Sequence, residues 1–143
     1  MKSLAIRNII LFLLLAGCSG GTTVSTHYSF PGETWKRFDN AVFDARISHP
    51  GVFYTMHIEL EYDPALAPVQ LPITVIMTAP SGEIRSRTLT LTTNPKQEKI
   101  RMPLRTEFAF REKGTCVFEI ENRSQYVETK GVKRIGVIME AMD

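Results

Sequence analysis

Apolar and polar residues alternate along most of the chain from Tyr28 onward, and no segment there carries apolar residues at helical spacing. The clearest alternation runs from Val52 to Tyr62. One face of this run holds the apolar side chains Tyr54, Met56, Ile58, Leu60 and Tyr62, and the other holds Thr55, His57, Glu59 and Glu61. A strand with this pattern buries one face in a core and exposes the other to water. The pattern therefore predicts an all-β protein.

Shorter strands are predicted on both sides of this run, separated by turn-forming residues. They are Thr34–Asp39, Ala41–Ile47, Ile73–Ala79, Glu83–Leu91, Lys99–Arg105, the segment around Phe108 and Phe110, Cys116–Ile120 and Val132–Glu140. Proline cannot donate a ladder hydrogen bond, so Pro64, Pro68 and Pro72 predict a loop or sheet edge before Ile73, and Pro103 predicts an edge strand. About eight strands favour a single β-sandwich of Greek-key, jelly-roll or Ig-like type over residues 27–143.

The N-terminal residues 1–17 have the parts of a secretory signal that is cleaved, namely two positive charges, a short apolar run and small residues at its end. The run from Ile9 to Ala16 is too short to span a bilayer, which requires about 20 apolar residues. The residues Leu15, Ala16, Gly17 and Cys18 resemble the lipobox of bacterial lipoproteins at all four positions. The sequence thus predicts a lipoprotein signal peptide, with a plain signal peptide as the alternative.

Use of this lipobox implies that Cys18 becomes the first mature residue and carries acyl chains, which makes the lipid bilayer a partner. Residues 18–26 are small and polar, and they predict a lipidated N-terminus followed by a flexible tether. The eight residues after Cys18 reach at most about 26 Å. By resemblance to lipoprotein sorting signals, Ser19 in place of aspartate favours an outer-membrane location facing the periplasm.

The mature chain has room for one domain and carries no net charge. Of 143 residues, 126 remain after the signal, and that length suits one core better than two. Lys2 and Arg7 are removed with the signal, so 15 of the 17 lysines and arginines remain, and they balance the 15 aspartates and glutamates in charge. We expect no nucleic-acid partner, because no basic patch or aromatic-basic module is evident. Cys116 is left without a disulfide partner, and its strand-like context predicts a core position.

The polar face of the clearest strand is the first candidate site for ligands or partners. His57, Glu59 and Glu61 are neighbours along it, about 6.6 to 7 Å apart, a spacing compatible with a metal or a carboxylate pair. The competing interpretation, which we favour, is a solvated face whose glutamates pair across the sheet with Arg85 and Arg87. Adjacent acids of one strand do not flank a cleft as glycosidase carboxylates do. We therefore predict no catalytic residues, no metal and no cofactor.

Trp35 is the second candidate. With Tyr28, Phe30 and Tyr54 it would form an aromatic platform for stacking on sugars, while the only tryptophan of a small β domain is more often found in the core. Both interpretations of Trp35 stay open at the level of the sequence. The platform, if formed, would make the chain a carbohydrate-binding β-sandwich lipoprotein of the cell envelope.

A set of aromatic, glycine, apolar and charged residues lies in the last part of the chain: Phe108, Phe110, Gly114, Thr115, Phe118, Ile120, Glu121, Arg123, Gly131, Val132, Ile135, Gly136, Val137 and Glu140. In these residues the chain resembles the gliding-motility lipoprotein H (GldH) family, with Cys116 standing where that family usually has tyrosine. The resemblance implies a non-enzymatic accessory lipoprotein of the gliding motility and associated protein secretion machinery, with other cell-envelope proteins as partners. It supplies no catalytic residues.

Overall fold

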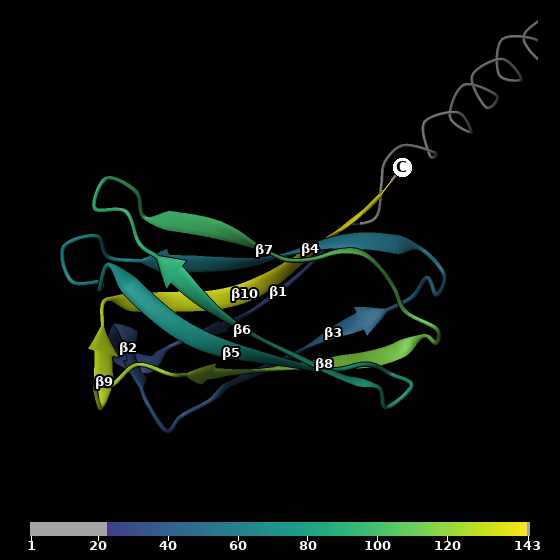
Figure 1. The fold of residues 1–143 in the computed structure, drawn as a ribbon, viewed down its shortest axis with the longest axis horizontal. Helices are drawn as coiled ribbons and strands as arrows, with labels where there is room; N and C mark the ends of the chain where they lie inside the picture. The colour runs from purple at the N-terminus through teal and green to yellow at the C-terminus, as the bar shows by residue number, and fades with distance from the viewer. Residues whose placement is uncertain (1–22, 143) are drawn as a thin grey trace, which may run out of the picture.

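In the computed structural model, which describes residues 23–142, two antiparallel four-stranded sheets pack face to face (Figure 1). The first sheet has the order β1-β10-β4-β7, from Thr23–Ser29, Val132–Ala141, Phe53–Tyr62 and Lys99–Ala109. The second has the order β3-β8-β5-β6, from Ala41–Ile47, Gly114–Asn122, Gln70–Thr78 and Ile84–Thr92. After the short turn η1 (Pro31–Glu33), β2 (Thr34–Lys36) pairs with β9 (Glu128–Lys130) at one end. The predicted all-β sandwich is confirmed, with ten strands in the described part rather than about eight.

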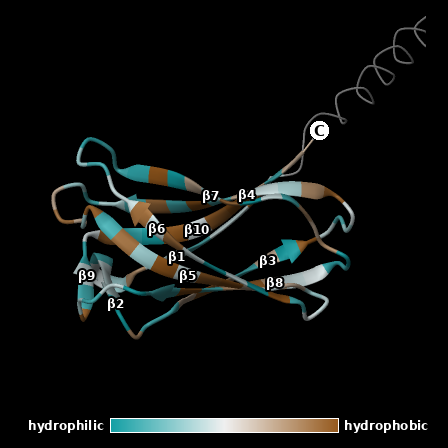
Figure 2. Ribbon diagram, viewed as in Figure 1, coloured by the Kyte–Doolittle hydropathy of each residue, from teal (hydrophilic) through white to brown (hydrophobic). Residues whose placement is uncertain are grey.

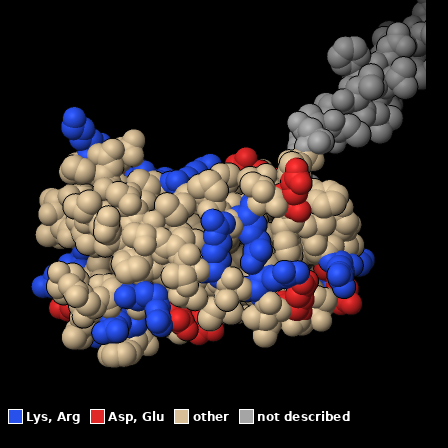
Figure 3. All heavy atoms as spheres, in the orientation of Figure 1, with Lys and Arg blue, Asp and Glu red and all other residues tan. Residues whose placement is uncertain are grey.

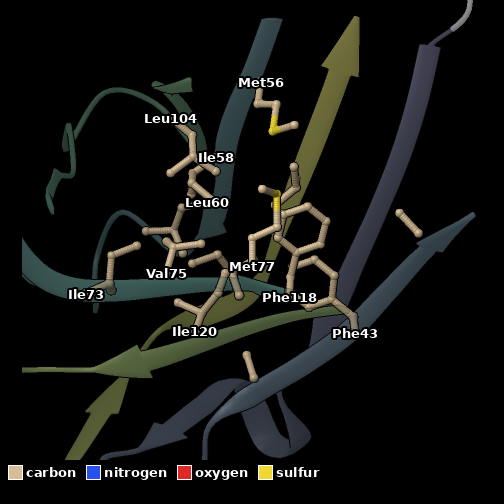
Figure 4. Close-up of a cluster of buried hydrophobic side chains, with 14 of the residues drawn as sticks. Phe43, Met56, Ile58, Leu60, Ile73, Val75, Met77, Leu104, Phe118 and Ile120 are labelled. Carbon is tan, nitrogen blue, oxygen red and sulfur yellow. The ribbon is translucent and has the colours of Figure 1, made fainter. Parts of the chain in front are cut away.

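The core fills the space between the two sheets because each strand turns alternate side chains inward. Figure 2 shows this alternation of hydropathy along the strands. In Figure 4, Ile58 and Leu104 from the first sheet point toward Val75 and Phe118 from the second, and all four side chains are buried. Cys116 lies in β8 with no exposed surface, which confirms its predicted core position.

Several strand boundaries follow the alternation closely, and others do not. The strand β3 has the predicted bounds, and β4 begins one residue later than predicted. The strand predicted over Thr34–Asp39 is too long, because β2 ends at Lys36. The chain turns there, and the Asp39 N–H donates to the Lys36 carbonyl at 3.0 Å. Lys99–Arg105 is too short, because β7 continues to Ala109 across irregular pairing with β4.

The prolines show which interruptions a sheet tolerates. Pro103 lies in β7 at the edge of the first sheet, as predicted. Pro72, however, lies inside β5, an inner strand that begins at Gln70, so the loop predicted as far as Ile73 is wrong there. The Pro72 carbonyl accepts a hydrogen bond from the N–H of Arg123, just beyond the end of β8. The missing N–H of Pro72 therefore falls where the ladder with β8 has already ended.

The N-terminal boundary of the sandwich is also earlier than predicted. Residues 23–26 were expected to belong to the tether, but they form the first half of β1 and pair with β10 from Thr23↔Glu140 onward. Val24 and Tyr28 pack against the core, so the ladder has a hydrophobic anchor as well. The predicted signal peptide and Cys18 lie outside the described residues.

No helix among residues 23–142 is both long enough and apolar enough to cross a membrane.

Candidate functional site

The outward face of the first sheet brings together residues from all four of its strands. One row across this face is His27 on β1, Gly136 on β10, Glu59 on β4 and Arg101 on β7. Because Ile58 and Leu60 point into the core, Glu59 must point away from it. The predicted polar face of β4 is thus an outer surface of the sandwich.

A hollow forms over Gly136, where the side chain of an inner strand is missing. It has a volume of about 260 Å³ and is lined by Ser25, Thr26, His27, Glu59, Glu61, Arg134, Gly136 and Ile138. A Cβ at Gly136 would lie 2.4 Å from the Thr26 carbonyl oxygen and 2.8 Å from the His27 Cβ. Glycine is therefore required for β1 to pass this close to β10.

Each carboxylate of the hollow is held by a basic partner on a neighbouring strand. Glu59 accepts from the Arg101 Nε at 2.8 Å and lies 3.5 Å from the Lys99 ammonium. Glu61 accepts from the Arg134 Nε. These pairs fix the direction of both carboxylates, while their partial exposure limits each to about 1 kcal/mol of stabilisation at most.

The prediction that Glu59 and Glu61 pair with Arg85 and Arg87 is wrong. Both lie on β6 in the second sheet, whereas β4 has β10 and β7 as its neighbours. Arg85 pairs instead with Glu83 at the preceding turn. The general prediction of cross-strand ion pairs on this face is confirmed, but alternation along one strand does not reveal which strand lies beside it.

His57 shares the outward face but not the hollow. Its cross-strand neighbours are Ile138 and Pro103, and its buried Nδ1 finds no hydrogen-bond partner within the described residues. Because its ring lies between apolar cross-strand neighbours, His57 does not form the predicted ligand site with Glu59. Among residues 23–142, no three His, Cys, Asp or Glu side chains come together where they would hold a metal ion.

The aromatic platform around Trp35 is wrong, and the competing core position is observed. The indole has no exposed surface, stacks on Phe30 with ring centroids 4.7 Å apart, and donates its Nε1–H to the Asp39 carbonyl at 2.8 Å. Tyr54 is buried as well. Burial of a large aromatic surface with its one donor satisfied is favourable, and it removes Trp35 from the candidate ligand surface.

Burial raises the pKa of the Cys116 thiol to about 12. The thiol therefore stays protonated at neutral pH and is no nucleophile.

Sequence reasoning missed Gly136, Arg134 and His27. The signal that marks Gly136 is visible in retrospect, since a glycine within an alternating strand indicates a close approach of another backbone. Nothing local marks His27 or Arg134, which join Glu59 and Glu61 only through the strand order.

Comparison with known proteins gave structural likenesses only. No family model matches the chain, and no curated protein matches it. Among solved structures, it is similar to TmCBM61 in complex with β-1,4-galactotriose (12% identity, 76% of this chain and 68% of that one, TM-score 0.37). It is also similar to a CBM4 protein (11% identity, 88% and 81%, TM-score 0.43). A third similar structure is the globular domain of zebrafish complement 1qA protein (11% identity, 86% and 97%, TM-score 0.45). Each is a likeness of overall architecture at very low sequence identity.

Proposed function

We propose that this chain is a non-enzymatic binding module of the cell envelope, anchored by a lipid at Cys18, and that the hollow over Gly136 binds a neutral carbohydrate. The observation that carries the proposal is the set of fixed polar groups around that hollow. The carboxylates of Glu59 and Glu61 accept hydrogen bonds, and the guanidinium of Arg134 donates them. A sugar hydroxyl both donates and accepts, so it matches such a mixed lining.

The same arrangement supports binding rather than hydrolysis. Glu59 and Glu61 lie on one strand and face the same way, and each is paired with a cation. A glycosidase places its two carboxyl groups on opposite sides of the scissile bond and keeps one of them protonated. The ion pairs hold both carboxylates in fixed directions, which suits them as hydrogen-bond acceptors.

Titration of the detergent-solubilised full chain with neutral oligosaccharides selected on a glycan array tests this proposal. We expect Glu61→Ala to weaken binding at least tenfold, because it removes an acceptor and frees Arg134. Glu121→Ala is the matched control, since it breaks the comparable Glu121–Arg123 pair on the second sheet. Absence of any neutral glycan ligand, or equal losses in both variants, would contradict the carbohydrate assignment.

A second candidate function rests on the residues that resemble the GldH family, from Phe108 to Glu140. They favour an accessory component of the gliding motility and associated secretion machinery in the outer membrane. Affinity purification of the tagged chain from solubilised outer membrane should then recover components of that machinery. Repeated recovery of the chain alone would contradict it.

The anchor has its own test. Metabolic labelling with palmitate should label the parent chain, and Cys18→Ala should abolish the label and leave an unprocessed precursor. A Cys18→Ala chain that is still processed and still fractionates with lipid would refute the lipobox interpretation.

A further inference from the structure

A second charged region lies at the open edge of the sandwich, where β6 and β7 are the last strands of their sheets. Both strands lie on the side of the sandwich away from β1 and β3. In Figure 1, β6 runs across the front of the molecule below β7, and Figure 3 shows Lys and Arg side chains gathered in the middle of that face.

Two arginines of β6 occupy positions that alternation assigns to the core side. Arg85 and Arg87 pair with Met77 and Val75 of β5, both of which are buried. Because side chains of directly paired residues share a face, the two arginines extend from the inner face of β6 across the open edge. The Arg87 Nη1 donates to the Leu104 carbonyl of β7, so this side chain spans from one sheet to the other.

The strand β7 adds a third guanidinium to the same place. Arg105 follows Leu104 where the pairing with β4 is irregular, and its guanidinium carbon lies 5.9 Å from the centre of the Phe108 ring. Its pKa is lowered, first by partial burial and then by the positive charges of Arg85 and Arg87. The three arginines are therefore close enough to repel one another.

The positive charge of this edge is only partly compensated. Of the three arginines, Arg85 alone has a carboxylate partner, Glu83, within salt-bridge distance among the described residues. The cluster of three arginines and one glutamate is left with an excess of two positive charges. Beside it lies a cleft of about 400 Å³ lined by Ser86, Arg87, Leu104, Arg105, Thr106 and Phe108.

We propose that this cleft, here called the arginine cleft, binds a phosphate monoester dianion. The excess of two positive charges matches, in magnitude, the negative charge that a phosphate monoester approaches at neutral pH. Guanidinium groups offer paired N–H donors that match phosphate oxygens. Ser86 and Thr106 add polar residues to the lining of the same cleft. The phosphate is carried either by a soluble metabolite or by a lipid headgroup. This site is separate from the hollow over Gly136, and the proposal does not depend on the carbohydrate function.

Calorimetric titration of the full chain in neutral detergent, at constant ionic strength, tests the proposal. The probes are inorganic phosphate, glycerol 3-phosphate and dihexanoyl phosphatidate below its micellar concentration. We expect saturable one-to-one binding of the soluble phosphates if the natural source is a metabolite. Binding at least tenfold tighter for the phosphatidate indicates a lipid headgroup, and either result supports the cleft as a phosphate site.

The variants locate the site. We expect Arg105→Gln to weaken phosphate binding at least tenfold, and Arg101→Gln to leave it unchanged. Arg101 is the matched control because it lies on the same strand, but on the outer face, where it pairs with Glu59. Thr106→Glu retains all three arginines and places a competing carboxylate in the cleft, so it should abolish binding even if an arginine variant folds poorly. No binding of any phosphate by the parent, or equal losses for Arg101→Gln and Arg105→Gln, would overturn the proposal.

Discussion

The outer face over Gly136 and the arginine cleft both carry charged side chains, but the two regions differ in whether those charges have partners of opposite sign. On the outer face, Glu59 and Glu61 each have a basic partner across a strand boundary. In the arginine cleft, Arg87 and Arg105 have no carboxylate within salt-bridge distance among the described residues. One surface is internally neutralised, and the other keeps its charge available.

The position of each strand within its sheet explains the difference. The strand β4 is an inner strand, so Glu59 has residues of β10 on one side and of β7 on the other. Among the described residues β6 is an edge strand, so within its sheet Arg85 and Arg87 are paired with β5 alone, where they lie opposite Met77 and Val75. Inward-pointing charge on an edge strand also discourages pairing with another chain.

The largest effect is expected at Gly136, on which the hollow depends. Gly136→Ala should lower the free energy of unfolding by about 1–3 kcal/mol, because the new Cβ would overlap the backbone of β1. Urea unfolding followed by fluorescence of the single, buried Trp35 measures this loss. Gly82→Asn is the control, since no described residue lies within 4 Å of an added Cβ there and Asn is among the residues that adopt a positive φ, here +88°, most readily. Equal losses for the two variants would show that crowding by β1 is not the cause.

In the interior between the two regions, ionisation of the buried Cys116 thiol should be unfavourable in the folded state. The folded thiol of Cys116 has a pKa of about 12, against 9.0 as its ordinary value, so the unfolded chain loses this proton first as the pH rises. Stability is therefore retained below pH 9 and declines above it, by up to about 1.4 kcal/mol per pH unit from this group. Urea unfolding at pH 8 and pH 10 should show a shallower decline for Cys116→Ala. Parallel declines in the parent and the variant would contradict the assignment.

An added carboxylate should act with opposite sign in the two regions. Thr106→Glu places it beside Arg105 and should raise the free energy of unfolding by about 0.5 kcal/mol. Thr55→Glu places it directly opposite Glu140 on the outer face and should lower that free energy by a similar amount. Thermal unfolding at low and high salt measures both changes, and each should shrink at high salt. Changes of the same sign would remove the contrast between the two regions.

The smallest effect concerns the ion pair between Glu59 and Arg101. A double-mutant cycle with Glu59→Gln and Arg101→Gln should give a coupling energy of about 0.2–0.5 kcal/mol, because both side chains are partly exposed. A coupling energy above about 2 kcal/mol would mean that the outer face contributes to stability as a buried network does.

The sequence predicted those features that depend on which way a side chain faces. Alternation located β3 and β4 and placed Glu59 and Glu61 on one outer surface, and the apolar context of Cys116 indicated its burial. Alternation with a period of two does not reveal which strands are neighbours, so it could not predict Arg101 and Arg134 as the partners of Glu59 and Glu61.

Two other features needed tertiary contacts. The sequence allows Trp35 as a surface aromatic or as core, with core the commoner position for the only tryptophan of a small β domain, and its burial against Phe30 decides between them. The arginine cleft arises because β6 and β7, which are hydrogen-bonded to different strands, end up at one edge. Arg85 and Arg87 gave no sequence signal for this cleft beyond occupying positions that alternation would fill with apolar residues.

The pairing of β1 with β10 has a mechanical consequence. Seven residue pairs join the two strands, from Thr23↔Glu140 to Ser29↔Arg134. If Cys18 carries the lipid, a ligand held at the hollow or the arginine cleft would transmit its pull to the membrane through the N-terminal end of β1. The component of that tension along the axis of β1 would shear the strand past β10. The interstrand hydrogen bonds lie perpendicular to that axis, so they would share the load together instead of opening one after another.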